Sequence, residues 1–374
     1  MLEHSPLGAS SAERWMNCPG SVRLINLLQT GEPQVEDDPD WRRDGVQAHD
    51  LAALCLNDRI DTWEAVDTER FSELTPDMMD AVQTHLNYVR SRPGAKLVEL
   101  RMHRPEFHDM MYGTTDAAVL DPERLEVIDY KHGIGIVVEV ENNPQIMYYA
   151  YMIIDELGSA WHDDAPITLT IVQPRVTWRE PIRSWQTTVG HIRQWATDTL
   201  LPAMVRVTTD AYLDTGDHCR FCPAKLICPA MLAVGSRVAG IADVKALSEP
   251  VLAELLTKVP VLKMLTKALT EEAKRRMITE RGKLPGWKVV QAIADRVWKD
   301  TAPVADTYGF KPQEPLSPAA VEKLEGGKEF VAEWAFRPNA GYDIVPETDR
   351  RKPILMETST EKWQSFLDNM KDKA

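Results

Sequence analysis

Hydrophobic and polar positions in the first ninety residues recur at helical spacing. The segment 10–13, Ser-Ser-Ala-Glu, has the spacing of a capping box and predicts the start of a short helix that carries Trp15. The segment 17–21, Asn-Cys-Pro-Gly-Ser, interrupts that helix. Apolar periodicity then predicts helices over 22–28, 41–57 and 81–91. Residues 31–40 are predicted to form an acidic loop, and residues 58–80 an acidic, solvated loop with the start of a helix.

The pattern changes to short β-type runs at Lys96. Runs bounded by turn residues predict strands over 96–103, 110–120, 124–131, 136–141 and 167–173, with a further hairpin over 178–189. Helical spacing returns over 143–157 and 190–207. Together these elements predict an α/β core in which helices flank a mixed central sheet, and we assign this core to residues 1–235.

Residues 236–374 form a second region, richer in Lys, Ala and Leu. A helix is predicted over 244–281, broken near Pro250 and Pro260 because proline lacks the amide that continues a helix. A turn and strand follow at 284–290, and the proline-rich tail carries short helices at 318–324 and 361–370. We therefore predict a mainly helical C-terminal extension that binds DNA or a partner.

Composition narrows the class of protein. The 374 residues are 44% hydrophobic, which is enough to build a sizeable core. Because no apolar run is long enough to cross a membrane and no signal-peptide pattern is visible, we expect a cytoplasmic location and no membrane partner. The net charge of −14 disfavours general coating of nucleic acid. Without a Gly-x-x-x-x-Gly-Lys-Ser/Thr loop, no nucleoside triphosphate is expected as a partner.

Two acidic residues and a lysine in neighbouring β-type runs carry the strongest chemical pattern. Asp116 follows Gly113-Thr-Thr, and Asp129 and Lys131 follow 13 and 15 residues later. Alternate residues of a strand share a face, so Asp129 and Lys131 point to one side, where a paired hairpin brings Asp116. Converging carboxylates suit Mg²⁺ or Mn²⁺, and the lysine can stabilise charge on a phosphate. The alternative is an exposed hairpin with surface salt bridges.

An acid followed by Asp/Glu-x-Lys on the adjacent strand resembles the PD-(D/E)XK nucleases. Two further motifs resemble the RecB-like branch of that superfamily, namely the helix 45–49, Gly-Val-Gln-Ala-His, and the helix 145–149, Gln-Ile-Met-Tyr-Tyr. The resemblance implies that His49 joins Asp116 and Asp129 at the metal, and that Gln145 and Tyr149 orient DNA and Lys131. Taken alone, a histidine on an amphipathic helix is more often an ordinary half-buried side chain.

The cysteines form a separate pattern. Three of them make a Cys-x₂-Cys-x₅-Cys run, Cys219, Cys222 and Cys228, and Cys18 lies 201 residues before the first. Four thiolates can hold Zn²⁺ or an iron–sulfur cluster, and His218 could replace Cys18 as a zinc ligand. The arrangement of one upstream and three downstream cysteines resembles AddB-like members of the family, which implies a [4Fe–4S] cluster. Either metal would fasten the first helix to the end of the core. The fifth cysteine, Cys55, is expected in the core.

The whole chain is similar to a phage-encoded family of stand-alone RecB-like exonucleases, once described as a domain of unknown function. The segments that carry this likeness are 10–21, Ser-Ser-Ala-Glu-Arg-Trp-Met-Asn-Cys-Pro-Gly-Ser, and 286–290, Gly-Trp-Lys-Val-Val. The resemblance implies a role in phage DNA recombination or replication, in the host cytoplasm. It also implies a possible partner, a phage single-strand annealing or binding protein.

A local excess of positive charge supplies a candidate DNA contact. Between Lys258 and Lys299 there are 11 basic and 4 acidic residues, a net charge of +7. We expect Lys274, Arg275 and Arg276 to bind DNA here, the alternative being a solvated helix face. The sequence thus predicts a Mg²⁺-dependent DNA exonuclease. Its rivals are an endonuclease with the same site and a non-catalytic, metal-stapled nucleic-acid-binding protein.

Overall fold

The computed structural model describes residues 5–29, 40–65, 71, 74–122, 124–157, 161–299, 303–308, 310–311, 314–339 and 341–354. The chain divides into two compact units, 1–265 and 266–374. The functional division predicted at 235/236 stays a prediction. The predicted helix at 361–370 and nearly all of the acidic loop at 31–40 lie outside the described residues. Among the described residues, no helix combines the length and apolar character needed to cross a membrane.

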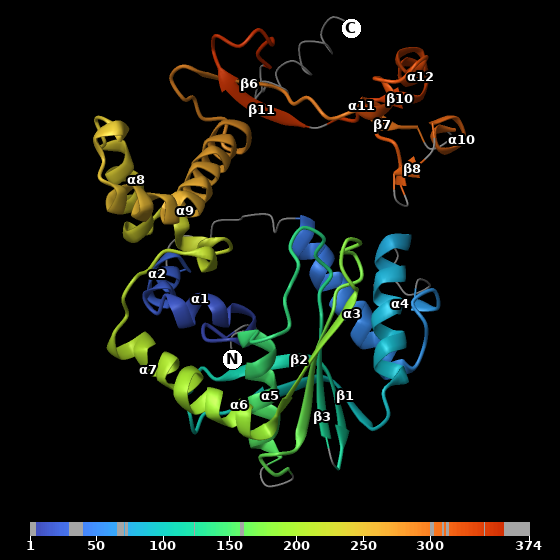
Figure 1. Cartoon of the computed structure of the whole chain (residues 1–374), viewed down its shortest axis with the longest axis vertical. Helices are drawn as coiled ribbons and strands as arrows, with labels where there is room; N and C mark the ends of the chain where they lie inside the picture. The colour runs from blue at the N-terminus through green and yellow to red at the C-terminus, as the bar shows by residue number, and fades with distance from the viewer. Residues whose placement is uncertain are drawn as a thin grey trace, which may run out of the picture. The chain divides into compact units, whose positions relative to one another are not determined.

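A five-stranded sheet lies at the centre of the first unit (Figure 1). Its strands, in spatial and chain order, are β1 (Ala95–His103), β2 (Tyr112–Asp121), β3 (Arg124–Tyr130), β4 (Pro166–Val172) and β5 (Ile182–Thr188). Neighbours pair antiparallel except β3 and β4, which are parallel. A parallel pair needs a crossover, which α5 (Pro144–Glu156) supplies. The predicted mixed α/β core is confirmed.

Helices cover both faces of this sheet. On one face, Ile128 and Tyr130 of β3 pack with α3 (Asp40–Asp58) and α4 (Pro76–Ser91). On the other, Leu125 and Val127 pack with a helical layer, which consists of α5, α6 (Val189–Trp195) and α7 (Leu201–Thr209). The two sets alternate along β3, as side chains of a strand must. Both faces are therefore core, and polar groups in the strands lie among apolar neighbours.

The first unit contains further helices from the two ends of its sequence. They are α1 (Ala12–Asn17), α2 (Gly20–Gln29), α8 (Pro229–Ala239) and α9 (Glu249–Lys274), which runs past the end of the unit. Short 3₁₀ turns lie at Ala9–Ser11, Asp217–Cys219, Pro223–Leu226 and Val244–Ala246. The turns at 217–226 place the cysteine run between helices rather than inside one.

The second unit combines short helices with two-stranded sheets. Its helices are a π-helical turn (Arg275–Thr279), α10 (Val304–Tyr308), α11 (Pro318–Val321) and α12 (Gly327–Trp334). Its antiparallel pairs are β6 (Trp287–Gln291) with β11 (Tyr342–Pro346), β7 (Val297–Trp298) with β10 (Ala335–Phe336), and β8 (Phe310–Lys311) with β9 (Glu314–Pro315). Of these strands, the sequence had indicated only the one at 284–290.

Several local predictions were wrong. Residues 136–141 form a loop instead of a strand, and 178–189 holds one strand, β5, instead of a hairpin. The capping box does not form, because Ser10, its first residue, lies inside the 3₁₀ turn Ala9–Ser11 and does not precede α1. Ser11, which does precede α1, caps no helix amide, and its Oγ donates to Gly8 O (3.3 Å). The helix predicted at 81–91 begins at Pro76, where Thr75 Oγ1 accepts a hydrogen bond from the amide of Met78 (3.2 Å).

Proline affects two helices differently from what the sequence predicts. The helix over 244–281 is not broken at Pro260, which lies inside α9, and Pro250 stands in the first turn, where the missing amide costs no hydrogen bond. The helix over 190–207 contains a π-helical turn, Ala196–Leu200, just before Pro202. Because Pro202 cannot donate to the preceding turn, the hydrogen-bond ladder widens there.

Candidate active site

Strand register places three carboxylates in one row across the sheet. Ala117 of β2 faces Ile128 of β3, so the next positions, Asp116 and Asp129, lie side by side. On the other side of β2, the pairs of Val98 with Ala117 and Leu100 with Thr115 put Glu99 beside Asp116. The hairpin predicted from the spacing of Asp116 and Asp129 is therefore present, and Glu99 joins it from β1.

Glu99 was not anticipated from the sequence. Its φ is +49°, and Leu97 and Leu100 on either side both pack against the same hydrophobic cluster. The alternation of β1 is therefore interrupted at Glu99. A left-handed backbone is unfavourable for a residue with a side chain and persists where the surroundings hold it in place. An acidic residue within the otherwise apolar run Leu97-Val98-Glu99-Leu100 was the only available hint.

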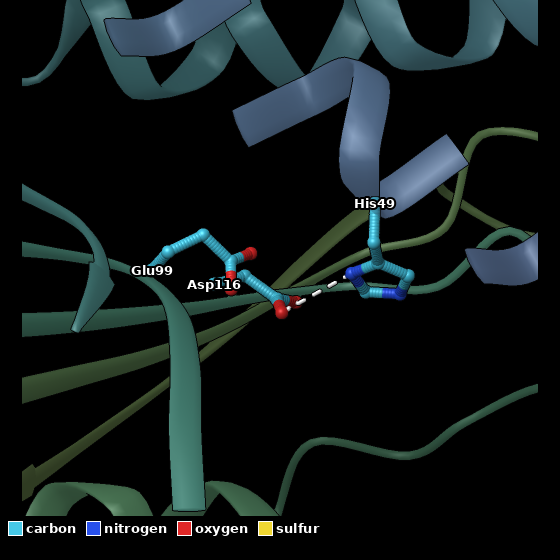
Figure 2. A group of neighbouring side chains, drawn as sticks. All are labelled: His49, Glu99 and Asp116. Atoms are coloured by element: carbon cyan, nitrogen blue, oxygen red, sulfur yellow. Dashed lines mark ion pairs between the residues drawn. The ribbon is translucent and has the colours of Figure 1, made fainter. Parts of the chain in front are cut away.

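His49, Glu99 and Asp116 form a group able to hold a metal ion (Figure 2). Each offers one ligand atom, and these atoms all lie within 4.8 Å of one another. His49 reaches the strands from α3, with Nδ1 3.2 Å from Asp116 Oδ1, and its ring meets the ring of Tyr130 edge-on at 5.4 Å. Two carboxylates and an imidazole suit a divalent cation. Asp129, which the sequence placed with His49 and Asp116, is not part of this tight group.

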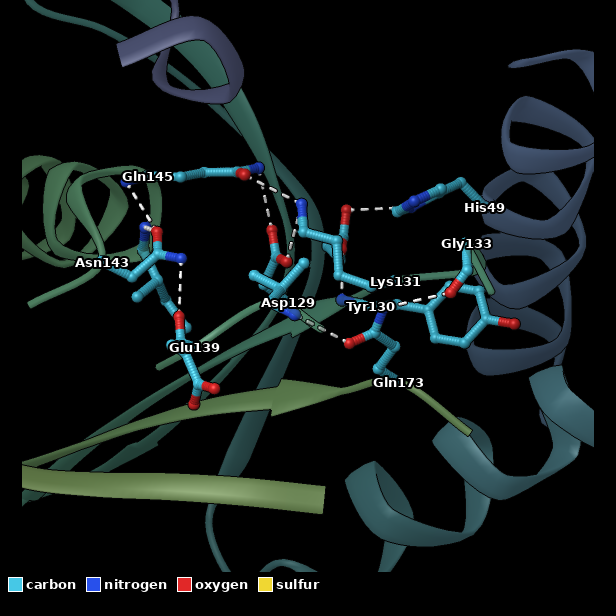
Figure 3. Close-up of polar contacts among 12 residues, drawn as sticks. His49, Asp129, Tyr130, Lys131, Gly133, Glu139, Asn143, Gln145 and Gln173 are labelled. Carbon is cyan, nitrogen blue, oxygen red and sulfur yellow. Dashed lines mark hydrogen bonds and ion pairs between the residues drawn. The ribbon is translucent and has the colours of Figure 1, made fainter. Parts of the chain in front are cut away.

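Asp129 instead belongs to a triangle with Lys131 and Gln145 (Figure 3). Lys131 Nζ lies 2.9 Å from Asp129 Oδ2 and donates to Gln145 Oε1 (2.8 Å), and Gln145 Nε2 donates to Asp129 Oδ1 (3.0 Å). Gln145 is fixed because Asn143 caps α5, its Oδ1 accepting from the amides of Gln145 (3.0 Å) and Ile146 (3.4 Å). The side chain of Asp129 is only 3% exposed, so its charge is compensated by these two partners.

Tyr149 lies one turn beyond Gln145 on α5 and is buried. Gly113 of β2 lies against its ring, since a Cβ on Gly113 would stand 3.4 Å from Tyr149 Cε1. Burial and the charges of Asp129 and Asp116 raise the pKa of Tyr149 above its usual range. Its hydroxyl therefore stays protonated at neutral pH and acts as a packing and hydrogen-bonding group.

The pKa values of the two aspartates are shifted in opposite directions. Burial would raise the pKa of Asp116, but the charge and hydrogen bond of His49, the charge of Lys131 and the amide of Tyr130 (2.7 Å from Oδ2) lower it to about 2. Burial raises the pKa of Asp129, and Lys131 offsets only part of this effect. Although the side chain of Glu99 is exposed at the surface, partial desolvation raises its pKa to about 7, with the charge of Asp116 adding to the shift. Such a concentration of shifted carboxyl groups is typical of a functional site.

A histidine behind the site gives a prediction about stability. His85 is fully buried on α4 against the ring of Tyr130 (5.0 Å), and burial lowers its pKa from 6.5 to about 4. Below pH 6.5 the unfolded chain therefore binds a proton that the folded chain refuses, so the free energy of unfolding falls as pH falls. The share of His85 between pH 7 and 5 is about 2 kcal/mol. In His85→Phe, urea unfolding at pH 7 and pH 5 should show a pH dependence of the free energy of unfolding that is smaller by this amount. The control His162→Phe, at an exposed histidine, should keep the pH dependence of the wild type. The same pH dependence in both variants would contradict the prediction.

The predicted cysteine ligands lie around one small cavity. Cys18, Cys219, Cys222 and Cys228 all line it, with His218 beside them. All four are buried and free of disulfide bonds, and burial raises the pKa of Cys219 and Cys222. Among the described residues, no cysteine belongs to a group of three or more possible metal ligands whose ligand atoms all lie within 4.8 Å of one another. Cys55 is buried elsewhere, in the cluster between α3, α4 and the sheet, as predicted.

Gly20 explains how Cys18 reaches this cavity. The amide of Gly20 donates to Tyr212 O (2.8 Å), and a Cβ at Gly20 would stand 2.5 Å from Ala211 O. Only glycine allows the two chain segments to approach so closely. The same approach brings the amide of Asp214 to 3.4 Å from Cys18 Sγ. The Asn-Cys-Pro-Gly segment therefore joins the start of the chain to the cysteine run.

The predicted DNA-binding side chains are paired with carboxylates. Lys274 Nζ lies 3.1 Å from Asp343 Oδ1, Arg275 contacts Glu272 and Glu280 (2.8 and 2.7 Å), and Arg276 contacts Glu272 (2.6 Å). A phosphate would have to compete with these partners, of which Glu280 is exposed and Glu272 and Asp343 are half-buried.

A family model described as "Protein of unknown function (DUF2800)" matches residues 4–352. The chain belongs to the DUF2800 family. The crystal structure of a "Putative exonuclease" from Eubacterium rectale is similar to this chain at 10% identity, covering 58% of this chain and 85% of that chain with a TM-score of 0.34. The crystal structure of SSO0001 is similar at 13% identity, covering 57% of this chain and 95% of that chain with a TM-score of 0.23. TM-scores at this level do not establish a common fold.

Proposed function

We propose that this chain is a divalent-metal-dependent deoxyribonuclease of the PD-(D/E)XK type that acts as an exonuclease. The observation that carries the proposal is the meeting of Asp116, in the middle of β2, with Asp129 and Lys131 at the end of β3, with His49 beside Asp116. An exposed hairpin with ordinary salt bridges would not bury Asp129 or shift the pKa values of its neighbours.

The donor set fits a hard divalent cation. His49, Glu99 and Asp116 would hold Mg²⁺ or Mn²⁺, with Asp129 as a further carboxylate beside Asp116. When bound, the cation supplies positive charge to phosphate oxygens and lowers the pKa of a water molecule.

The protein's own side chains supply the rest. Lys131 carries an ammonium that Asp129 and Gln145 hold in one orientation, so that it can stabilise negative charge developing on a phosphodiester. Asp129 pairs with that ammonium through Oδ2. Gln145 bonds to both, so a change at Gln145 would misplace the lysine without removing its charge.

Purified protein incubated with linear and with covalently closed circular duplex DNA, in Mg²⁺ and in EDTA, tests the proposal. An exonuclease degrades the linear DNA alone, and only with the metal. Degradation of the circle indicates an endonuclease with the same site. No degradation of either DNA in Mg²⁺ or Mn²⁺ points to a binding protein and overturns the proposal.

The cysteine cavity is proposed to hold a [4Fe–4S] cluster. Four buried thiols around one cavity, with a backbone amide directed at Cys18 Sγ, form a suitable donor set. A single Zn²⁺ draws its four sulfurs to about 4 Å from one another, since Zn–S bonds are about 2.3 Å. A cluster of four irons would lie between its thiolates and hold them further apart than a single zinc ion does. Zinc bound by three cysteines and His218 or Cys18 is the alternative.

The partners of this nuclease are proposed from the resemblance of its sequence. The substrate is DNA. Degradation of one strand of a duplex would leave single-stranded ends, to which a phage annealing or single-strand-binding protein could bind. Co-purification of the chain with such a protein, before and after digestion of the DNA, tests this proposal. Co-purification that survives the digestion indicates a direct contact, and co-purification that is lost indicates a contact through the DNA.

Lys274, Arg275 and Arg276 are proposed to contact DNA phosphates. Hydrogen bonds from Arg275 and then Arg276 lower the pKa of Glu272 to about 2, so phosphates must displace a carboxylate that stays ionised. The triple alanine variant should bind duplex DNA more weakly, with the slope of log K against log salt reduced by about 0.9 for each lost contact. Lys323→Ala combined with Lys328→Ala, two exposed lysines of the same unit, is the control. An unchanged slope in the triple variant would reassign this segment to a partner or to oligomerisation.

A further inference from the structure

Two surface loops leave the sheet beside the candidate active site. The first, 132–141, follows Lys131 at the end of β3, and the second, 173–181, follows β4. Because β3 and β4 are parallel, with Tyr130 opposite Val172, both loops begin at the same edge of the sheet. The amide of Lys131 donates to Val172 O (2.8 Å), which continues this pairing into the loops. Ligands of open α/β sheets bind at such carboxyl ends.

Gln173 fixes the first loop. It is 1% exposed, and its side chain uses its full hydrogen-bonding capacity. Oε1 accepts from the amide of Val138 (3.0 Å) and from Arg183 Nη2 (2.8 Å). Nε2 donates to Ile136 O (2.7 Å) and to Gly133 O (3.0 Å), the latter bond being drawn in Figure 3. These bonds to the backbone of the first loop replace a strand ladder, which is why 136–141 is not a strand.

Further bonds join the two loops into one structure. The amide of Gln173 donates to Pro181 O (2.7 Å) and closes the second loop. Arg179 contacts Glu139 (2.7 Å), and Arg175 Nη1 donates to His132 Nε2 (2.8 Å), so each loop is held by the other. At the far end of the first loop, Asn143 Nδ2 donates to Glu139 O (2.9 Å), which ties the loop to the cap of α5 (Figure 3).

This rigid pair of loops presents large apolar side chains to solvent. Ile134 is 48% exposed, Ile136 is 40% exposed and Trp178 is 59% exposed. Gly133 and Gly135 flank Ile134, and a Cβ on either glycine would meet nothing within 4 Å. Hydrogen bonds from the buried side chain of Gln173 thus hold the backbone of the first loop, while the apolar side chains remain outside the core. Such an arrangement loses little conformational entropy on binding and favours an apolar ligand.

The chemistry of the neighbouring site identifies that ligand. A DNA strand whose phosphodiester lies at Lys131 carries flat, apolar base faces within a nucleotide or two of it. Tryptophan stacks on any base, and isoleucine can insert between base steps. We propose that the loops 132–141 and 173–181 form a nucleobase platform that holds the unpaired bases of the strand being cut, through Trp178, Ile134 and Ile136. This proposal rests on the proposed function, because it takes DNA as the substrate of the adjacent site.

Binding without metal tests the platform separately from cleavage. In EDTA, fluorescence anisotropy measures the affinity of the protein for a labelled single-stranded oligonucleotide and for abasic strands of equal length. One abasic strand lacks the terminal bases at its 5′ end, and the other lacks those at its 3′ end. The wild type should bind the abasic strand about tenfold more weakly, since stacking contributes ~1–3 kcal/mol per base. Trp178→Ala, and Ile134→Ser combined with Ile136→Ser, should shrink this ratio toward one while leaving the affinity for the abasic strand unchanged.

Trp63→Ala is the matched control, because Trp63 is also 59% exposed and lies far from these loops in the sequence. It should keep the wild-type ratio. A wild-type ratio near one, or a ratio unchanged in both platform variants, would overturn the platform even if linear DNA is degraded in Mg²⁺. A normal ratio without any degradation would instead overturn the nuclease and leave a base-binding protein.

Discussion

Asp116→Asn is expected to lower Mg²⁺-dependent cleavage of linear DNA by about 1,000-fold or more. Asp116 lies at the centre of the site, because it contacts His49 and lies beside both Glu99 and Asp129. Its Oδ2 also accepts a hydrogen bond from the amide of Tyr130. A bound metal contributes several kcal/mol to stabilising a phosphoryl transition state, and each ~1.4 kcal/mol is a factor of ten in rate. Initial rates on end-labelled duplex measure the effect.

The asparagine side chain keeps an acceptor for the Tyr130 amide, so circular dichroism and the unfolding midpoint should stay close to those of the wild type. Asp164→Asn, at an exposed aspartate of the same unit, should retain full activity. Cleavage by Asp116→Asn at the wild-type rate, in protein free of contaminating nuclease, would refute the assignment of the site.

Glu99→Gln separates the two possible ligand sets. If Glu99 binds the metal, the Mg²⁺ concentration for half-maximal activity should rise in this variant while activity returns at saturating metal. If only His49, Asp116 and Asp129 bind it, as the sequence predicts, the metal requirement should match that of the wild type.

The parts of the site that could be predicted are those that depend on local geometry. Asp129 and Lys131 stand two residues apart on one run, and Asp116 precedes a tight turn that dictates the register of β2 with β3. Gln145 follows Lys131 closely enough for α5 to return over the same strand end. In each of these cases the spacing in the sequence sets the spacing in the fold.

The parts that could not be predicted depend on long-range contacts. Glu99 lies in the site because its backbone adopts a φ of +49° and interrupts the strand. The pattern of apolar residues along the sequence does not predict this interruption. The loop at 136–141 carries the β-rich sequence Ile-Val-Val-Glu-Val-Glu, but Gln173, more than thirty residues later, takes up its backbone groups. Propensity describes what a segment prefers alone, and a buried amide side chain outweighs it here.

Pro260 shows the same limit in the helical region. Proline in a helix interior removes one hydrogen bond, which favours a break. In α9 the neighbouring side chains Val261 and Leu265 are buried against the cysteine run and α8, so packing holds the helix together across the proline. The energy of a buried face therefore decides the outcome, and the sequence pattern around one residue does not reveal it.

Cys222→Ser is expected to cost the protein both its cluster and much of its stability. Anaerobically purified wild type should be brown, with about four irons per chain, and the variant should be colourless. Because Cys18 and the cysteine run lie 201 residues apart, a cluster between them constrains the unfolded chain strongly, and its loss should lower the unfolding midpoint and expose the start of the chain to protease. Iron analysis, visible absorbance and thermal unfolding of the same preparation measure these effects.

Cys55→Ser is the matched control, since Cys55 is also buried but packs between α3, α4 and the sheet. Any general effect of placing a hydroxyl in the core should appear in both variants, whereas colour and iron should be lost only from Cys222→Ser. Stoichiometric zinc without iron in the wild type would replace the cluster by a zinc site, and His218→Ala would then tell whether His218 or Cys18 completes it. A Cys222→Ser variant as stable as Cys55→Ser would show that the metal does not hold α1 and α2 to the cysteine run, which would leave the close approach at Gly20 as the contact that does.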